Sequence, residues 1–335
     1  MSPWYVPAAF LVAMMLSLYL TPQARAAALR LGIVDRPDGK LKTQREPVPY
    51  LGGLAVFLAY LLALGLLTAF DRQVLAMLLA GTLALLVGLV DDFGVLSPLP
   101  KVLGLGVAVF ALLRAGVIVE LVELPFALHW FLAALWLLLL ANAWNLVDVM
   151  DGLAPGLAVL AASGMALVGV FSGQEDLALP AAALAGAVLG FLPANLPPAR
   201  IYLGDAGSLS LGLTLGALAL AVRWSGVSPA GFLAPLAFFA LPLSEVAFLV
   251  VLRTRRGIPF WQGSPDHVAL RWRSLRRGDG RAVVRRLWLW QAAFSAVGVA
   301  LALSPAFWLP LLALLALSLA WALWLLRLSL VGVAA

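Results

Sequence analysis

The stretch FLAALWLLLLANAWNLVDVMDGLA, residues 131–154, decides the fold. It opens with an unbroken apolar run, Phe131–Ala141, of the kind that crosses a bilayer as a helix. Two amides and two carboxylates then follow at intervals of three residues: Asn142, Asn145, Asp148 and Asp151. Steps of three keep side chains near one face of a helix. The stretch therefore predicts a membrane helix that ends in a cluster of oxygen ligands, which suits a hard divalent cation such as Mg²⁺.

The composition of the whole chain is that of a membrane protein. It is 64% hydrophobic and 11% charged, with a mean hydropathy of +1.03, whereas a soluble domain is nearer half apolar and a quarter charged. The apolar runs do not alternate, so they predict helices rather than a barrel. The absence of cysteine excludes thiolate metal sites, and two histidines, His129 and His267, argue against a histidine zinc site. We expect an all-α polytopic membrane protein in which residues 1–335 form a single domain.

About eleven transmembrane spans are predicted, and the charges between them orient the chain. The spans lie near residues 3–20, 50–70, 74–90, 102–119, 126–143, 154–172, 179–193, 206–222, 231–252, 287–304 and 306–326. Basic residues concentrate in alternate connectors, which by the positive-inside rule are cytoplasmic. These cytoplasmic loops are expected near 21–49, 91–101, 144–153, 194–205 and 253–286. The N-terminus is then outside and the C-terminus inside, and the net charge of +6 reflects topology rather than nucleic-acid binding.

Three acidic motifs meet at the cytoplasmic face in this topology. The first is the Asp91-Asp92 pair that ends the 74–90 span, and the second is the motif from Asn145 to Asp151 described above. The third contains Asp205, which begins a later span within the motif YLGDAGSLSLG. Ionisable groups at membrane depth are costly and usually functional. Two adjacent carboxylates at a helix C-terminus repel each other and the helix dipole, so a cation is expected to offset them, either Mg²⁺ or Lys101. Asp205 is also a candidate helix N-cap, and Gly204 beside it would let backbone N–H groups approach an anion.

Two further cytoplasmic loops carry candidate phosphate ligands. The Pro/Gly-rich loop Val34–Gly53 is either a charged turn at the membrane or a loop in which Lys40 and Lys42 contact phosphate or nucleotide. Most arginines of the 253–286 loop are expected to lie against anionic lipid headgroups. Its Pro-Asp-His turn ends at His267, and Arg271 follows one helical turn later, in a position suited to phosphate oxygens. Glu245, inside the preceding span, is interpreted as a buried paired group or a pocket wall.

Acidic motifs with Lys and Arg at a membrane surface indicate Mg²⁺-assisted phosphoryl transfer to a lipid-borne nucleophile. A lipid-linked-sugar or cation transporter is the non-enzymatic alternative. Transporters usually show repeat symmetry and broken helices near the midplane. We find no internal repeat, and the acids lie at one face, which favours the enzyme.

The ordered motifs resemble those of a known family. DRPDGKLK…PVPYLGG, the Asp-Asp pair followed by GVLSP, NAWNLVDVMDGLA, YLGDAGS and the Pro-Asp-His loop occur in family order between residues 34 and 271. This pattern is similar to that of the polyprenyl-phosphate N-acetylhexosamine-1-phosphate transferases. The resemblance implies that a UDP-N-acetylhexosamine donates its sugar-1-phosphate to undecaprenyl phosphate in the bacterial inner membrane. It also implies release of UMP, dependence on Mg²⁺ with Mn²⁺ as a substitute, and a homodimer.

The resemblance also implies roles for individual residues. Asn145 and Asp205 would bind the metal, and Asp91 and Asp92 would be the catalytic pair. The substrate-binding set would comprise Lys42, Lys101, Asp148, Asp151, Gly204, His267 and Arg271. Asp151 would face uracil, and direct attack by the lipid phosphate is favoured over an aspartyl-phosphate intermediate.

The short first loop and the span count look like the branch that uses UDP-GlcNAc. A phospho-MurNAc-pentapeptide or other UDP-hexose donor is the alternative. Relatives of the GlcNAc branch often have histidines where Gln44 and Leu270 stand here, so Arg271 is expected to carry more of the diphosphate contact.

Overall fold

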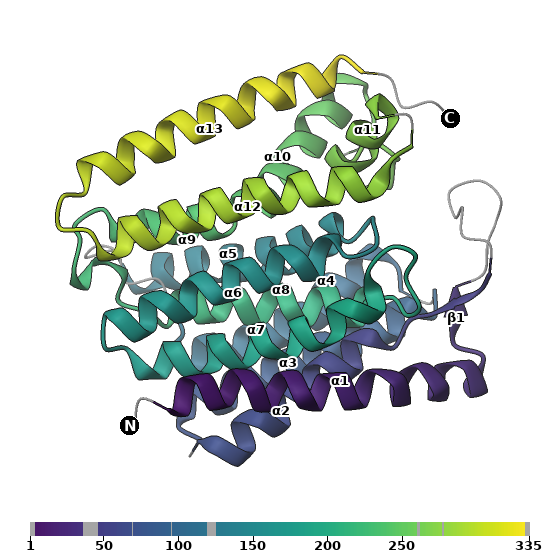
Figure 1. Cartoon of the computed structure of the whole chain (residues 1–335), viewed down its shortest axis with the longest axis horizontal. Coiled ribbons are helices and arrows are strands. Elements are labelled where there is room, and N and C mark those ends of the chain that lie inside the picture. Colours follow the sequence, from purple (N-terminus) through teal and green to yellow (C-terminus); the bar gives the residue numbers. More distant parts are fainter. Residues whose placement is uncertain are drawn as a thin grey trace.

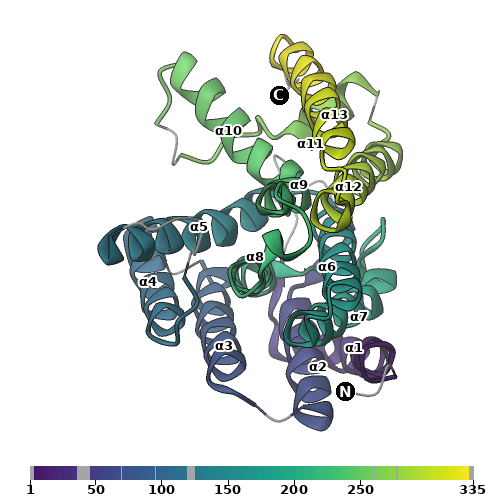
Figure 2. The ribbon, with the colours of Figure 1, turned by 90° about the vertical axis from the view of Figure 1, so that its left-hand side faces the viewer.

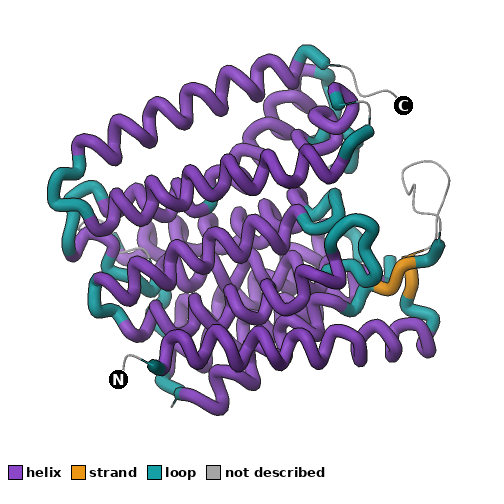
Figure 3. Tube along the Cα trace, viewed as in Figure 1, coloured by secondary structure: helices purple, strands orange, loops and turns teal. Residues whose placement is uncertain are grey.

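Long helices run side by side through the molecule (Figures 1 and 3). The computed structural model describes residues 4–35, 46–68, 70–94, 96–118, 125–259, 262–276 and 278–331. The α-helices of the first half are α1 (Tyr5–Leu31), α2 (Gly52–Leu67), α3 (Arg72–Asp92), α4 (Pro98–Arg114), α5 (Phe126–Val147) and α6 (Leu153–Phe171). Those of the second half are α7 (Glu175–Asn195), α8 (Gly204–Leu220), α9 (Ala234–Phe238), α10 (Ala240–Arg255), α11 (Val268–Leu275), α12 (Gly280–Leu303) and α13 (Trp308–Ser329). Two short 3₁₀ turns, η1 (Trp224–Gly226) and η2 (Gly231–Leu233), precede α9, and strands β1 (Val34–Asp35) and β2 (Val48–Pro49) form an antiparallel pair.

Every predicted span coincides with a helix or a helix pair. Among the described residues, eight helices are long and apolar enough to cross a membrane, and α2 is a shorter apolar helix. The expectation of an all-α polytopic membrane protein is therefore confirmed. Helix α1 begins and α13 ends at opposite ends of the bundle, as an odd number of spans requires (Figure 1). The count of eleven, the orientation in the membrane and the single domain stay predictions.

The predicted span 231–252 is not straight. Segment Gly231–Phe238 and helix α10 meet at an angle of 66°. The reason lies in Pro242, which has no backbone N–H to donate to the carbonyl four residues earlier and whose ring crowds it. That carbonyl, on Phe238, instead accepts a hydrogen bond from Gln291 Nε2 of α12 at 2.9 Å. The bend is thus stabilised by a side chain distant in the sequence.

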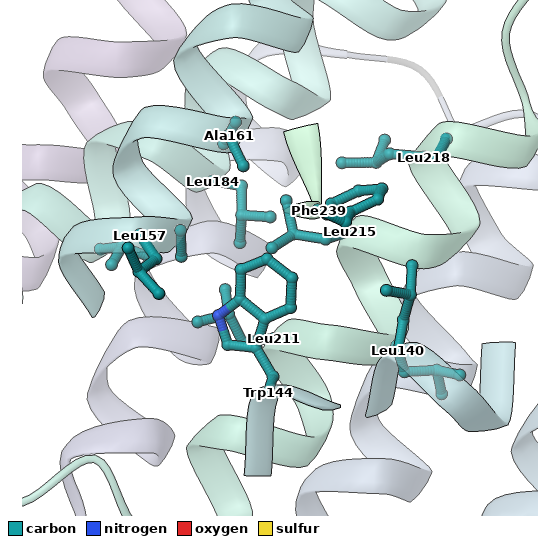
Figure 4. Packing of buried hydrophobic residues seen from close by; sticks show 14 of the residues in the cluster. Leu140, Trp144, Leu157, Ala161, Leu184, Leu211, Leu215, Leu218 and Phe239 are labelled. Carbon is teal, nitrogen blue, oxygen red and sulfur yellow. The ribbon is translucent and has the colours of Figure 1, made fainter. Parts of the chain in front are cut away.

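Helix α8 lies at the centre of the bundle, with α3, α5 and α6 around it (Figure 2). The indole of Trp144, in the last two turns of α5, is fully buried and packs edge-on against Phe239 with ring centroids 5.6 Å apart. Leu211 and Leu215 of α8 lie beside this indole (Figure 4). Burial of Trp144 sets the rotation of α5, and so determines where the neighbouring Asn145 points.

Glycines allow α3 to approach the start of α8 closely. A Cβ added to Gly88 would lie 2.3 Å from the carbonyl oxygen of Asp205 and 2.4 Å from the nitrogen of Ala206. These are backbone atoms, so the helices themselves would have to separate. The position of the α8 N-terminus therefore depends on a residue without a side chain in α3.

We expect Gly88→Ala to destabilise the protein by about 1–3 kcal/mol, the usual cost of overpacking. Thermal unfolding in detergent measures this loss. Gly106→Ala in α4 is the matched control, because a Cβ there meets nothing within 4 Å. Its gain in helix propensity should leave stability unchanged or slightly higher. Equal melting temperatures for the two variants would contradict the close approach of α3 and α8.

Candidate active site

Four helix ends bring polar side chains to one point. Asp91 is near the end of α3, Lys101 is in the first turn of α4, Asn145 is in the last turn of α5, and Asp205 is in the first turn of α8. The Lys101 ammonium lies 2.6 Å from Asp91 Oδ2 and 3.1 Å from Asp205 Oδ2. It also donates to Asn145 Oδ1 at 3.2 Å. Oxygens from three helices thus surround one positive charge, and we call these four residues the central cluster.

Asn145 joins the cluster to α8 through its amide. Its Nδ2 donates to Asp205 Oδ1 at 2.7 Å and to Ser208 Oγ at 3.1 Å. Ser208 is one helical turn after Asp205 and is completely buried. Ser208 is not among the predicted site residues, although its place in the YLGDAGS motif was a signal that could have found it.

Asp92 lies beside the cluster in a different environment from Asp91. Its Oδ1 accepts from the backbone N–H of Asp205 at 2.8 Å, and its Oδ2 accepts from that of Ala206 at 3.1 Å. A carboxylate from α3 thus caps the N-terminus of α8, where N–H groups lack partners within the helix and the dipole is positive. Gly204 makes room for this contact: it has φ +77°, and a Cβ there would lie 2.7 Å from Asp92 Oδ2. The predicted pair is therefore divided between a carboxylate paired with Lys101 and a carboxylate that orients α8.

The loop between α5 and α6 is attached to the loop before α8. Asp151 Oδ2 accepts from the N–H of Ala199 at 2.9 Å. Buried Asn195 accepts from the N–H of Gly152 at 2.9 Å and donates to the carbonyl of Ile201 at 2.9 Å. Asn195 is a positioning residue that the sequence analysis missed. A lone amide at the apolar end of α7 was the available signal.

The start of α2 also joins this edge of the site. The N–H of Gly53 donates to the carbonyl of Leu203 at 2.8 Å, immediately before the start of α8. The PVPYLGG motif therefore lies against the site. Lys42, predicted to bind substrate, falls outside the described residues.

Asp148 is a partly buried carboxyl near the central cluster. Burial raises its pKa well above the ordinary value, and the charges of Asp205, Asp92 and Asp151 raise it further. The folded state therefore binds a proton more tightly than the unfolded state does. The associated stability is present below the ordinary pKa and is lost as the pH rises through the folded pKa.

Asp148→Asn should accordingly stabilise the metal-free protein at neutral pH. We expect its melting temperature to rise by roughly 2–4 °C at pH 8 in EDTA, and the gain to shrink toward pH 4, near the ordinary pKa. Thermal unfolding across this range measures it. Asp176→Asn, which neutralises an exposed carboxylate at the start of α7, should show no such gain. A gain independent of pH would attribute the effect to packing rather than ionisation.

His267 and Arg271 are not joined to the central cluster. His267 Nδ1 lies 2.9 Å from Glu245 Oε1, and both oxygens of Glu245 accept from the N–H of Val268 at the start of α11. The structure therefore agrees with the interpretation of Glu245 as a buried group paired with another residue, here His267. No hydrogen bond or ion pair in the described residues links His267 to Asp91, Lys101 or Asp205.

Arg271, predicted to bind phosphate oxygens, has partners within the protein in this structure. Its guanidinium is completely buried, donates to Asp266 Oδ1 at 2.6 Å and to the carbonyl of Leu328 at 3.1 Å. Burial opposes ionisation of Asp266, but the hydrogen bond and charge of Arg271, helped by Arg256, hold its pKa below the ordinary value. Arg271 thus joins α11 to the C-terminal end of α13. Nη1 and Nη2 thus have partners within the protein, whereas the buried Nε has none, and the diphosphate contact of Arg271 stays a prediction.

The central cluster fits a divalent cation. The described residues contain no group of three or more His, Cys, Asp or Glu side chains with the spacing of a metal site. Two carboxylates and one amide nevertheless direct oxygens at a single cation, the Lys101 ammonium. Hard oxygen donors of this kind are the ones that Mg²⁺ prefers. The assignment of Asn145 and Asp205 as metal ligands stays a prediction, and the oxygen donors present suit it.

Comparison with known proteins identifies the family. Residues 74–223 match glycosyl transferase family 4. The chain is 32% identical over 321 residues to the decaprenyl-phosphate N-acetylglucosaminephosphotransferase of Mycobacterium tuberculosis, covering 84% of this chain and 78% of the relative. It is 30% identical over 272 residues to a probable undecaprenyl-phosphate N-acetylglucosaminyl 1-phosphate transferase of Bacillus subtilis, covering 78% and 75%.

A phospho-N-acetylmuramoyl-pentapeptide-transferase of Moorella thermoacetica is 34% identical over 244 residues, covering 65% of this chain and 76% of the relative. The matched region contains all four residues of the central cluster, Asp91, Lys101, Asn145 and Asp205. The chain is an enzyme of the transferase class and belongs to glycosyl transferase family 4, among the polyprenyl-phosphate N-acetylhexosamine-1-phosphate transferases.

Proposed function

We propose that the protein transfers GlcNAc-1-phosphate from UDP-GlcNAc to undecaprenyl phosphate, with Mg²⁺ as cofactor. An oxygen of the lipid phosphate forms a bond to the sugar-linked phosphorus. The bond from that phosphorus to the bridging oxygen breaks, and UMP leaves with the electron pair. The products are undecaprenyl-diphosphate-GlcNAc and UMP. The proposed setting is the cytoplasmic face of a bacterial plasma membrane, where the product would start a cell-envelope polysaccharide.

The observation that carries this proposal is the convergence of oxygens from α3, α5 and α8 on one cation. Transfer of a phosphoryl group between two anionic partners needs concentrated positive charge at a defined point. A helix-end cluster of two carboxylates, an amide and a lysine can hold such charge and still be reached from the membrane surface. A carbohydrate-binding or purely structural site would not need it.

Asn145 and Asp205 would hold the metal, with Asp91 beside them. Bound Mg²⁺ would neutralise negative charge on the donor diphosphate. Lys101 supplies a second positive charge for a phosphate oxygen. Asp92 acts by orienting α8 through the N–H groups of Asp205 and Ala206, which maintains the position of the Asp205 carboxylate.

The loop between α5 and α6 and the loop before α8, which are hydrogen-bonded to each other beside the central cluster, would bind the nucleotide. Asp151 and the backbone of the α5–α6 loop are the proposed contacts of uracil, and Asn195 keeps that loop in place. The proposed contact of His267 with phosphate requires the 262–268 segment to approach the cluster, and Glu245 would orient its ring. A homodimer is part of the proposal by family analogy alone.

Two relatives named for N-acetylglucosaminyl transfer support GlcNAc as the sugar, since each covers more of the chain than the relative named for N-acetylmuramoyl-pentapeptide. A donor panel tests this. Purified protein is incubated with undecaprenyl phosphate, Mg²⁺ and either UDP-GlcNAc, UDP-MurNAc-pentapeptide or another UDP-hexose, and UMP is measured. We expect UMP with UDP-GlcNAc and none without lipid or in EDTA. If UMP were released only with another donor, the assignment of GlcNAc as the sugar would be wrong. If no donor gave UMP, the proposed reaction would be refuted.

A further inference from the structure

Helices α11, α12 and α13 enclose a groove separate from the central cluster. Helices α12 and α13 diverge toward the end of the bundle where α11 lies between them (Figure 1). The groove there has a volume of about 540 Å³. Its lining residues are Trp272, Arg276, Trp290, Ala320, Leu323, Trp324 and Arg327. None of these residues belongs to the central cluster, so the groove requires its own explanation.

The walls of the groove are aromatic. The rings of Trp272 and Trp324 lie 4.9 Å apart, from α11 and α13 respectively. Trp290 of α12 packs against Trp321 at 5.1 Å. Tryptophan is enriched at membrane interfaces, where its ring is apolar and its N–H is polar. Buried Trp272 joins the groove to the protein core, and the partly exposed Trp290 and Trp324 give it the aromatic side chains of a membrane interface.

Its positive charge is concentrated at one end. Arg327 is in the last turn of α13, and its guanidinium lies 5.8 Å from the centre of the Trp324 ring. Arg276 immediately follows α11, and both arginines are exposed. Within the described part of the chain, no ion pair involves either of them. Two positive charges are thus available to an anion at the mouth of the groove.

The other end of the groove is apolar. Ala320 precedes Arg327 by seven residues, which is about 10 Å along a helix. Trp290 likewise lies well inside α12. A ligand that follows the groove would place an anionic group at the membrane boundary and an apolar chain toward the bilayer interior. Arg271 preserves this shape, because it bonds α11 to the carbonyl of Leu328 at the end of α13.

We propose that this groove binds one anionic phospholipid of the membrane leaflet at this end of the bundle. Its phosphate would lie between Arg276 and Arg327, and an acyl chain would follow Trp272, Trp290 and Leu323. Charge-assisted bonds from arginine to phosphate supply the selectivity, and apolar burial holds the chain. The inference is independent of the proposed reaction, since it uses no residue of the central cluster.

Native mass spectrometry of the purified full chain tests the inference. The protein is mixed with phosphatidylglycerol or phosphatidylcholine in detergent, and retained lipid is counted. We expect one tightly retained phosphatidylglycerol and no comparable phosphatidylcholine. Arg276→Gln with Arg327→Gln should weaken retention by roughly tenfold or more, the effect of losing two charge-assisted contacts.

Two further variants make the result specific. Arg281→Gln with Arg285→Gln removes the same charge from exposed positions on α12 outside the groove, and should leave retention unchanged. Ala320→Trp fills the apolar end without changing charge, and should reduce retention of the acyl chain. Circular dichroism and a single elution peak establish that each variant is folded.

Equal retention of phosphatidylglycerol by all variants would overturn the inference, as would equal retention of both phospholipids by the wild type. If undecaprenyl phosphate displaced phosphatidylglycerol and depended on the same arginine pair, the groove would belong to the acceptor lipid of the reaction. That outcome would overturn the phospholipid assignment.

Discussion

Asp205→Asn should reduce release of UMP by roughly a thousandfold, the scale on which loss of one essential electrostatic group acts. Asn has nearly the shape of Asp, so the substitution isolates the charge. That charge lies 3.1 Å from the Lys101 ammonium, and its other oxygen accepts from Asn145 at 2.7 Å. Without it, the cluster loses the carboxylate that we propose as a metal ligand, and the positive charge near the diphosphate falls.

Steady-state release of UMP and binding of Mn²⁺ by electron paramagnetic resonance measure the two consequences separately. Both should be lost together in Asp205→Asn. Asp176→Asn is the matched control, because it removes an exposed carboxylate at the start of α7, and should keep the activity of the wild type. An Asp205→Asn protein that retained a tenth of wild-type turnover would exclude Asp205 from the metal site.

Lys101→Met should have opposite effects on turnover and on metal binding. Lys101 is now the cation on which Asp91, Asp205 and Asn145 converge. A metal ion that enters the cluster in the absence of substrate must compete with this ammonium. Removal of the ammonium leaves two carboxylates without their internal counter-ion, which favours a metal and disfavours the empty cluster.

We therefore expect Lys101→Met to bind Mn²⁺ roughly tenfold more tightly than the wild type without nucleotide, equivalent to about 1.4 kcal/mol. Its melting temperature in EDTA should fall, and Mg²⁺ should restore it. Turnover should drop by roughly a hundredfold or more, because the second charge for the phosphates is gone. Lys101→Arg keeps the charge and should bind Mn²⁺ no more tightly than the wild type. Unchanged Mn²⁺ affinity in Lys101→Met would show that the lysine does not compete for the metal position.

Packing between helices that are far apart in the sequence gives two adjacent side chains, Asp91 and Asp92, different partners. Asp91 and Asp92 look alike in the sequence, and both were expected to be catalytic. Asp91 pairs with Lys101, whereas Asp92 accepts from N–H groups 113 and 114 residues away. The cause is the close approach of α3 to α8 at Gly88, one helical turn before the Asp-Asp pair, but the sequence around the pair does not show which helix packs there.

The partners of Arg271 likewise depend on packing that its sequence position does not show. Its spacing from His267 indicated a helical turn, which α11 confirms, and its chemistry indicated phosphate oxygens as partners. The partner is Asp266 of its own loop, supported by carbonyls at the end of α13. Spacing along the chain predicts what a side chain can bind, but not which of several acceptors reaches it first.

By itself, the sequence determined the helical class, the position of each long helix and the residue types at the site. A non-alternating apolar run of bilayer length can satisfy its backbone hydrogen bonds only as a helix. Acidic side chains at helix ends near the membrane require a cation beside them, which indicated the residue types at the site. The tertiary structure alone decided that Asp91, Lys101, Asn145 and Asp205 meet, that Asp92 caps α8 and that Asn195 fixes the adjoining loop. Each of these outcomes depends on contacts between residues far apart in the chain, and the physical reason is that packing of helices, rather than local preference, sets the distances between their ends.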